Sequence, residues 1–174
     1  MSHRLYDPFE LCWSVPVCAA VGIPLCSLPR VEDTTSPNFG IFEKFKIKIG
    51  SICGDANAAM FGEEMTEVGD VKITMGTGAF VDINTGSEPF PSATGAYPLV
   101  GWKLAGVTGN KGVTYLAEAD DQSCGVTLDW AATAGFYDSV EEGEIDAGKV
   151  NSSDGVLFIP GIWGITTPGM THIV

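Results

Sequence analysis

The sequence contains few residues of the kinds that build metal centres and polyanion-binding surfaces. Only two histidines, His3 and His172, occur among 174 residues, and because they stand near opposite ends they give a zinc site no support. Lysine and arginine number 9 against 22 acidic residues, a formal net charge of −13. The largest basic group is Lys44, Lys46 and Lys48. A surface that binds nucleic acid or an anionic membrane is therefore not expected.

The cysteines form no recognisable framework, since they number five and contain no CxxC pair. An odd set without paired spacing fits reduced thiols better than a disulfide scaffold, so we expect a cytoplasmic protein. Hydrophobic residues make up 45% of the chain and charged residues 18%, which is enough for a packed core. The 22 glycines and 10 prolines predict short elements separated by turns.

The chain also lacks a long uninterrupted apolar run. Residues 11–28 come closest to a targeting signal or membrane anchor, but Pro16 and Pro24 interrupt them. We expect a short helix there instead, with Ser14 as its N-cap, Pro16 in its first turn and Gly22 at its end. The polar residues 29–40 that follow predict a surface loop.

The stretch around which the chain is organised is residues 71–86, VKITMGTGAFVDINTG. Apolar residues recur on both sides of Gly76-Thr77-Gly78, which predicts a β-hairpin with two glycines and a hydroxyl at its tip. Glycines let backbone N–H groups approach an anionic oxygen closely, and Thr77 adds a side-chain donor. The tripeptide alone fits a plain turn as well as a phosphate contact.

Asp55 stands where an expected strand gives way to a helix. Residues 42–49 alternate between apolar side chains and lysines, which predicts a strand with a solvated lysine face, and residues 56–62 are rich in helix formers. An aspartate at such a junction fits a helix N-cap, because its carboxylate accepts backbone N–H bonds. It fits equally well a ligand-binding carboxylate at the carboxyl end of a strand. Position alone leaves both roles open.

Beyond the hairpin the pattern predicts strands followed by a helix. Val126, Trp130 and Ala134 recur at a spacing of four and are expected to face the core. Gly125 inside that helix costs about 1 kcal/mol relative to alanine, so it eases packing or leaves room for a ligand. The expected elements are strands at 97–104, 112–117 and 156–159, a helix at 120–136, and an acidic helical or irregular segment at 137–154.

Several motifs distributed along the chain belong together. They include Gly54-Asp55, the Ala-Ala-Met-Phe-Gly run ending at Gly62, the Met-Gly-Thr-Gly-Ala-Phe hairpin and Asn84-Thr85-Gly86. In this order and spacing they resemble the FGGY carbohydrate kinases, and within them a divergent branch of the glycerol kinases. The resemblance extends over nearly the whole chain to about Pro160, and the combination is specific although no single motif is.

The resemblance implies an α/β fold of two actin-like (ribonuclease H-like) ATPase domains around a deep cleft. The chain would hold the end of the first domain in residues 1–68 and the start of the second in residues 69–174. The turn at Gly69-Asp70 would be the boundary, and the sequence would be a fragment of the whole kinase.

The resemblance also implies an activity, the ATP-dependent phosphorylation of an alcohol group of a polyol, with glycerol as the first candidate and ATP and Mg²⁺ as cofactors. Asp55 would be the catalytic base, would contact the substrate and would hold the metal indirectly. Phe80 would lie near the polyol. The implied ATP-binding residues are Gly76, Thr77, Gly78 and Gly125.

The sequence departs from glycerol kinases at informative positions. Two glutamines follow the catalytic aspartate in that family, the first holding the polyol, whereas this chain has Ala56 and Asn57. Asp129 replaces a glutamine on the nucleotide side. The Asp-x-Gly-Thr phosphate loop, the Arg-Glu polyol contacts and the Gly-Gly-x-x-x-Asn adenosine site do not occur in these 174 residues. Because preorganisation carries most of phosphoryl transfer, we expect the isolated chain to be inactive.

Two other interpretations stay open. Ala56 weakens the assignment of glycerol, so a different FGGY sugar kinase is an alternative. The chain could instead be a non-catalytic interaction fragment or pseudoenzyme that associates with itself or with a full-length homologue, because an incomplete domain exposes apolar surface. The partners expected under the kinase hypothesis are ATP and a small polyol or sugar, with no nucleic acid and no membrane span.

Overall fold

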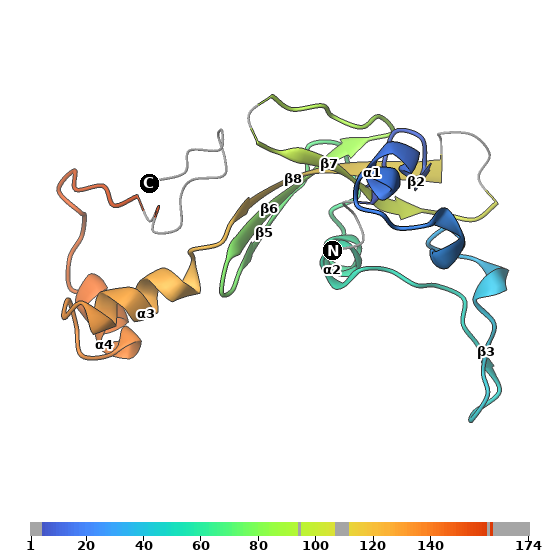
Figure 1. The fold of residues 1–174 in the computed structure, drawn as a ribbon. Helices are drawn as coiled ribbons and strands as arrows, with labels where there is room; N and C mark the ends of the chain where they lie inside the picture. The colour runs from blue at the N-terminus through green and yellow to red at the C-terminus, as the bar shows by residue number, and fades with distance from the viewer. Residues whose placement is uncertain (1–4, 94, 107–111, 160, 162–174) are drawn as a thin grey trace. The chain divides into compact units, whose positions relative to one another are not determined.

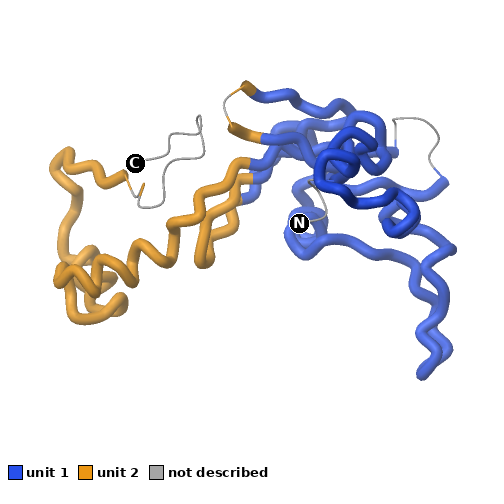
Figure 2. Tube along the Cα trace, in the orientation of Figure 1, with its two compact units in different colours: residues 1–72, 82–92, 97–118 blue, residues 73–81, 93–96, 119–174 orange. Residues whose placement is uncertain are grey.

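The computed structural model describes residues 5–93, 95–106, 112–159 and 161 (Figure 1). The chain divides into two compact units (Figure 2). Unit 1 comprises residues 1–72, 82–92 and 97–118, and unit 2 comprises residues 73–81, 93–96 and 119–174.

The largest sheet has four strands in the order β5-β6-β8-β7. The predicted hairpin is confirmed, since β5 spans Val71–Met75 and β6 spans Ala79–Gly86. β7 (Tyr97–Lys103) and β8 (Val113–Asp121) pair antiparallel, as two predicted strands that are also confirmed. β8 continues to Asp121, four residues beyond the expected end, and part of the loop that joins it to β7 lies outside the described residues.

A small apolar core holds α2 (Asp55–Gly62) in unit 1. Met60 of α2 is fully buried against Trp102 and Leu116, and Phe61 meets the Trp102 ring edge-on with centroids 5.2 Å apart. The Asn57 side-chain amide donates to the carbonyl oxygens of Val100 (3.0 Å) and Gly101 (2.9 Å), where β7 has a β-bulge. Apolar contact and two hydrogen bonds therefore fix α2 on β7.

The buried row of the β5–β6 hairpin is polar rather than apolar. Lys72, Asp82 and Asn84 are buried, whereas Ile73 and Met75 are 63% and 74% exposed. Successive side chains of a strand point to opposite faces, so the apolar row of this hairpin lies on the face opposite the buried polar row. Within the described residues that apolar face is exposed. The Asn84 amide donates to the Met65 carbonyl oxygen at 3.2 Å, and its side-chain oxygen accepts the Gly86 N–H.

The first residues of unit 1 form short elements. β1 (Tyr6–Asp7) pairs with β2 (Cys12–Trp13), and α1 (Val15–Ala20) follows with Ser14 at its N-cap position, as predicted. The Trp13 indole N–H donates to the Pro29 carbonyl oxygen at 2.7 Å. The five cysteines are free thiols in the structure.

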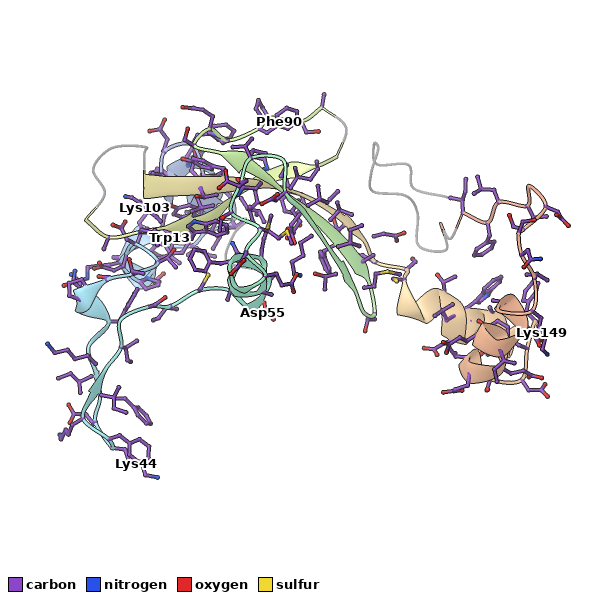
Figure 3. The ribbon with its side chains drawn as sticks, turned by 180° about the vertical axis from the view of Figure 1, so that it is seen from behind. Trp13, Lys44, Asp55, Phe90, Lys103 and Lys149 are labelled. Atoms are coloured by element: carbon purple, nitrogen blue, oxygen red, sulfur yellow. The ribbon has the colours of Figure 1, made fainter. Side chains whose placement is uncertain are left out.

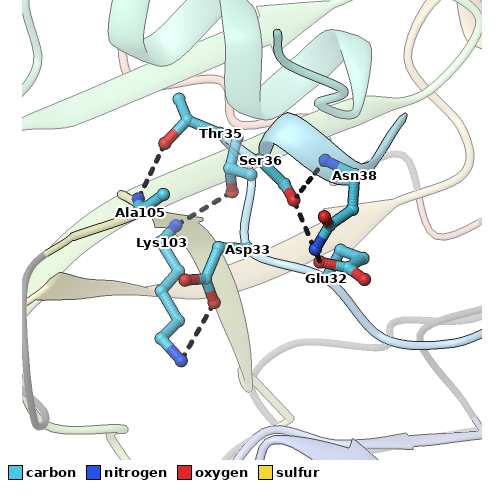
Figure 4. A network of polar contacts seen from close by, with 8 residues as sticks. Glu32, Asp33, Thr35, Ser36, Asn38, Lys103 and Ala105 are labelled. Carbon is cyan, nitrogen blue, oxygen red and sulfur yellow. Dashed lines mark hydrogen bonds and ion pairs between the residues drawn. The ribbon is translucent and has the colours of Figure 1, made fainter. Parts of the chain in front are cut away.

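The predicted loop at 29–40 contains a 3-10 turn (Pro37–Phe39) and is tied down by polar contacts in unit 1 (Figure 4). Lys103 forms an ion pair with Asp33 at 3.0 Å, and its backbone N–H donates to the Thr34 hydroxyl at 2.9 Å. Hydrogen bonds from Asn38 and Ser36 lower the pKa of the Glu32 carboxyl. The Lys103 contacts attach the loop to the end of β7, and the Glu32 contacts lie within the loop.

Three predicted elements differ from the structure. The strand expected at 42–49 is a hairpin of β3 (Ile41–Phe42) and β4 (Ile47–Lys48), which turns at Lys46 with a φ of 54°. The helix expected at 120–136 is shorter, because β8 runs through Asp120 and Asp121 and α3 spans Gly125–Thr133. Residues 156–159 form no strand and are largely exposed.

Helix α3 also differs in the face it buries. Thr127 is its buried residue, and Trp130 is 41% exposed, so the stripe at spacing four does not face a core in the described residues. Trp130 instead stacks on Phe158 with ring centroids 6.1 Å apart. The acidic segment contains α4 (Val140–Ala147), within the predicted helical or irregular region.

Candidate functional site

The hairpin tip and the start of α3 lie together in unit 2. The Gly125 backbone N–H donates to the Gly76 carbonyl oxygen at 2.9 Å, and the Cys124 N–H donates to the Thr77 carbonyl oxygen at 3.1 Å. Across the tip itself, the Gly76 N–H donates to the Gly78 carbonyl oxygen at 2.8 Å. These hydrogen bonds hold the tip against the first residue of the helix, leaving Thr77 exposed.

Two glycines are required by this close approach of backbones. A Cβ at Gly125 would lie 2.7 Å from the Gly76 carbonyl oxygen, and a Cβ at Gly78 would lie 2.7 Å from the Asp121 carbonyl oxygen. Both distances are shorter than atoms tolerate, and backbone atoms cannot swing aside as a side chain can. Gly125 therefore begins the helix rather than interrupting it, which corrects the expected interior position.

A pocket of about 290 Å³ opens beside these residues, wholly within unit 2. It gathers three of the four predicted ATP-binding residues, while Gly78 supports the tip from outside the lining. The site is mixed in character, with backbone polar groups on one side and aliphatic side chains on the other. The lining residues are Gly76, Thr77, Gly125, Val126, Leu128, Asp129 and Val140.

The sequence analysis did not predict that Val140 of α4 lines this pocket, although the sequence contains a motif that marks the start of α4. Ser139-Val140-Glu141-Glu142 has the sequence of a capping box. The Ser139 hydroxyl accepts the Glu142 N–H at 3.2 Å, and the Glu142 carboxylate accepts the N–H of Asp138, the residue before the N-cap, at 2.8 Å. This motif fixes the start of α4 and so the position of Val140. Tyr137 attaches the connection to α3, since its hydroxyl donates to the Leu128 carbonyl oxygen at 2.8 Å.

Asp55 lies at the first position of α2, in unit 1 (Figure 3). Gly54 is the N-cap, and the Asp55 carboxylate accepts the N–H of its neighbour Ala56 at 2.9 Å. The side chain is exposed and its helix is fixed by Met60 and Asn57, so the carboxylate is available to a ligand. The preceding strand, β4, ends at Lys48, and between it and Asp55 Ser51 makes an isolated bridge with Thr35. Asp55 therefore does not directly follow a regular strand, contrary to the expected junction.

The remaining predicted site residue, Phe80, belongs to unit 2 and is 39% exposed. Its place beside a polyol, and the approach of Asp55 to the hairpin tip, stay predictions. Within the described residues, no group of three or more His, Cys, Asp or Glu side chains is arranged to hold a metal ion. No described helix is long and apolar enough to cross a bilayer.

A second pocket, of about 170 Å³, lies in unit 1 and involves none of the predicted site residues. Its polar lining comes from Tyr6, Glu32, Thr34 and the Lys103–Asp33 ion pair. Burial raises the pKa of the Tyr6 hydroxyl to about 12, with smaller contributions from nearby Tyr115 and Cys12. Because the lysine and the carboxylate already neutralise each other, this pocket presents no unpaired charge from that pair.

Sequence comparison relates nearly the whole chain to glycerol kinases. Glycerol kinase 5 from Danio rerio is 44% identical over 168 residues, and the human protein of that name is 39% identical over the same length. A glycerol kinase from Desulforamulus reducens is 31% identical over 170 residues. The alignments cover 94% of this chain and about a third of each relative, 31% and 33%. No protein-family model matches the chain.

Solved structures give the same relationship. A Plasmodium falciparum glycerol kinase with ADP superposes with a TM-score of 0.80 and 27% identity, over 94% of this chain and 33% of that one. A xylulose kinase from Brucella ovis gives a TM-score of 0.75 at 15% identity, over 98% and 34%. The chain thus has the fold of about one third of an actin-like FGGY sugar kinase. Its named homologues are glycerol kinase 5 and glycerol kinase, which confirms the resemblance drawn from the motifs.

Proposed function

We propose that this chain supplies part of an ATP-dependent phosphotransferase that acts on an alcohol group of a polyol, with glycerol as the first candidate. The observation that carries the proposal is the pocket in unit 2, which gathers Gly76, Thr77 and Gly125 in a chain homologous to glycerol kinases. It is supported by the relative that was crystallised with ADP.

In this proposal the tip and α3 form one wall of a nucleotide site. Thr77 is exposed and offers a hydroxyl to a phosphate oxygen. The absence of side chains at Gly76, Gly78 and Gly125 lets a phosphate approach the tip closely, although the Gly76 and Gly125 N–H groups already donate to carbonyl oxygens of the tip. Asp129 in the same pocket opposes an anionic ligand, so ATP would bind together with a divalent cation.

Asp55 is the proposed general base. Its carboxylate would accept the proton of the substrate hydroxyl as that oxygen attacks the γ-phosphorus, and base catalysis of this kind contributes about 10²–10⁴-fold in rate. Mg²⁺ reaches such sites with the nucleotide phosphates and needs only one or two carboxylates from the protein, a role that Asp55 fits through an intervening water. When bound, the ion would neutralise charge on the phosphates.

The substrate end of the site is less complete. Phe80 is proposed to border the polyol, and the amide that holds the polyol in glycerol kinases is absent at Ala56. Asn57 cannot replace it in the described conformation, because its amide donates to Val100 and Gly101. A different sugar with fewer hydroxyls at that position is the alternative within the same enzyme class.

The test is a chimera in which residues 1–174 replace the matching third of the Danio rerio relative. We expect Mg-ATP-dependent release of ADP with glycerol, reduced at least 100-fold by Asp55→Asn. Glu63→Gln, an exposed acid at the end of the same helix, is the matched control and should leave turnover unchanged. Retention of turnover by Asp55→Asn would show that another group is the base. The isolated chain is expected to show no turnover in the same assay.

A second candidate is a non-catalytic protein that associates with copies of itself or with a full-length homologue. The observation that favours it is the outward apolar row of the hairpin, with Ile73 and Met75 63% and 74% exposed. Light scattering of the purified chain, with and without Ile73→Lys, distinguishes the two, because the kinase proposal needs no self-association.

A further inference from the structure

A row of four polar residues crosses the main sheet, one from each strand. Lys72 comes from β5, Asp82 from β6, Glu118 from β8 and Tyr97 from β7, which is the order in which the strands pair. All four belong to unit 1, and Tyr97 and Glu118 are direct partners in the β7–β8 register. The row is unrelated to the residues proposed above for phosphoryl transfer.

The centre of this row is buried. Asp82 is 1% exposed, and Lys72 and Glu118 are 9% exposed. The Tyr97 hydroxyl donates a hydrogen bond to one oxygen of Glu118. Neither oxygen of Asp82 receives a hydrogen bond from a donor in the part of the chain that the structure describes. A buried ionised carboxylate without donors is strongly unfavourable, so the state of Asp82 needs an explanation.

The neighbouring carboxyl group of Glu118 explains how Asp82 can be buried. Two ionised carboxylates are both acceptors and cannot hydrogen-bond, whereas a carboxyl that keeps its proton becomes a donor to the other. The pKa of the Asp82 carboxyl is raised to about 7 by the combined effect of its surroundings: burial raises it most, the Glu118 carboxylate adds to the rise by accepting the proton and by its charge, and the Lys72 ammonium lowers it. Glu118 and Lys72 are the charged groups that face Asp82.

We propose that Asp82 and Glu118 share one proton, forming a pH-dependent clasp across β6 and β8. With the proton present, Asp82 donates to Glu118, Tyr97 donates to the same carboxylate, and the remaining negative charge is balanced by Lys72. Loss of the proton leaves two buried negative charges beside one positive charge. A metal ion is disfavoured in this place, because Lys72 supplies positive charge and the described residues offer no third acidic, histidine or cysteine ligand.

The sign of the pH dependence follows from the raised pKa. The folded state holds the proton up to about pH 7, whereas the unfolded chain releases it near the ordinary value of 3.8. The stabilisation is therefore complete below the unfolded value, declines as the pH rises towards 7, and is absent above the folded value. Between these limits the unfolding equilibrium constant changes about tenfold per pH unit relative to a chain without the titrating group.

The experiment compares the full chain with Asp82→Asn, whose amide donates to Glu118 as the protonated acid does. Urea unfolding is measured from pH 5 to 8.5. We expect the unfolding constant of the wild type, relative to Asp82→Asn, to rise about tenfold per pH unit up to about pH 7 and then to level off. Glu63→Gln, exposed and outside the row, is the control and should show a constant ratio to the wild type over this range.

A second measurement needs no variant. Infrared spectra of the wild-type chain should contain a protonated carboxyl band that disappears as the pH rises through about 7, well above the range in which ordinary carboxyls titrate. A pH-independent ratio in the urea series, or loss of this band below pH 5, would overturn the proposal. Stabilisation of the wild type by Ca²⁺ or Mg²⁺ that is absent in Asp82→Asn would overturn it in favour of a cation.

Discussion

The backbone N–H of Gly125 donates to the carbonyl oxygen of Gly76 at 2.9 Å, which joins the first residue of α3 to the tip of the β5–β6 hairpin. The two residues are 49 positions apart in the sequence, and their contact creates the pocket attributed to the nucleotide. The hairpin tip is thereby held in place by the first turn of α3. The contact also explains why a helix that starts at this point begins with glycine rather than with a better helix former.

Replacing Gly125 with alanine tests this contact. The added Cβ would lie 2.7 Å from the Gly76 carbonyl oxygen, so the helix or the tip must move. We expect a loss of about 1–3 kcal/mol in the free energy of unfolding, typical of overpacking, although alanine is the better helix former. Urea unfolding measures it. Gly62→Ala is the matched control, because that α2 glycine has no atom within 4 Å of its would-be Cβ and should gain up to about 1 kcal/mol.

Asn57→Ala tests how α2 is held. The substitution removes the hydrogen bonds to the Val100 and Gly101 carbonyl oxygens, which are 3.0 and 2.9 Å long, and leaves both acceptors without that donor. We expect a loss of about 1–3 kcal/mol in unfolding free energy, measured by thermal or urea denaturation. Asn151→Ala, at an exposed position, should change stability by less than about 0.5 kcal/mol. An equal effect of the two variants would show that Asn57 does not anchor the helix.

Much of the fold is readable from the sequence where local chemistry is unambiguous. The hairpin at 71–86 carries period-2 alternation and glycines at its tip, and its strands occupy the predicted range. Helix α1 was found because Ser14 and Pro16 mark its start. In both cases a short-range pattern decides the conformation without help from distant residues.

Where distant residues decide, the prediction was wrong. Asp120 and Asp121 suit the start of a helix, but β8, which lies between β6 and β7 in the sheet, continues through them beyond the end of its β7 pairing at Glu118. The prediction at 42–49 was wrong for a local reason: the alternation fits a single strand, but a turn ending at Lys46 folds it into a hairpin. The buried row of Asp82 and Glu118 joins residues 36 positions apart, a relationship that no local pattern reveals.

Asp129→Gln tests the proposal that the pocket in unit 2 binds the nucleotide. Asp129 lines the pocket with Thr77 and Gly125, and its charge opposes phosphates that approach the tip. Removing a charge near the protein surface changes the binding free energy by about 1 kcal/mol, so Mg-ADP should bind severalfold more tightly. Isothermal titration of the chimera with Mg-ADP measures the effect. Asp138→Asn, an exposed acid outside the pocket lining, is the control, and equal affinities in the two variants would contradict the assignment.

Lys72→Met tests the charge balance of the polar row. The Lys72 ammonium lowers the pKa of the Asp82 carboxyl, so its removal should let the carboxyl keep its proton to higher pH. The protonated carboxyl band in the infrared spectrum should therefore disappear at a higher pH than in the wild type. Methionine retains the unbranched apolar stem of lysine, so the change removes chiefly the charge. Lys48→Met, on the exposed β4 strand, should leave the midpoint unchanged, and a downward shift in Lys72→Met would contradict the assigned role of the lysine.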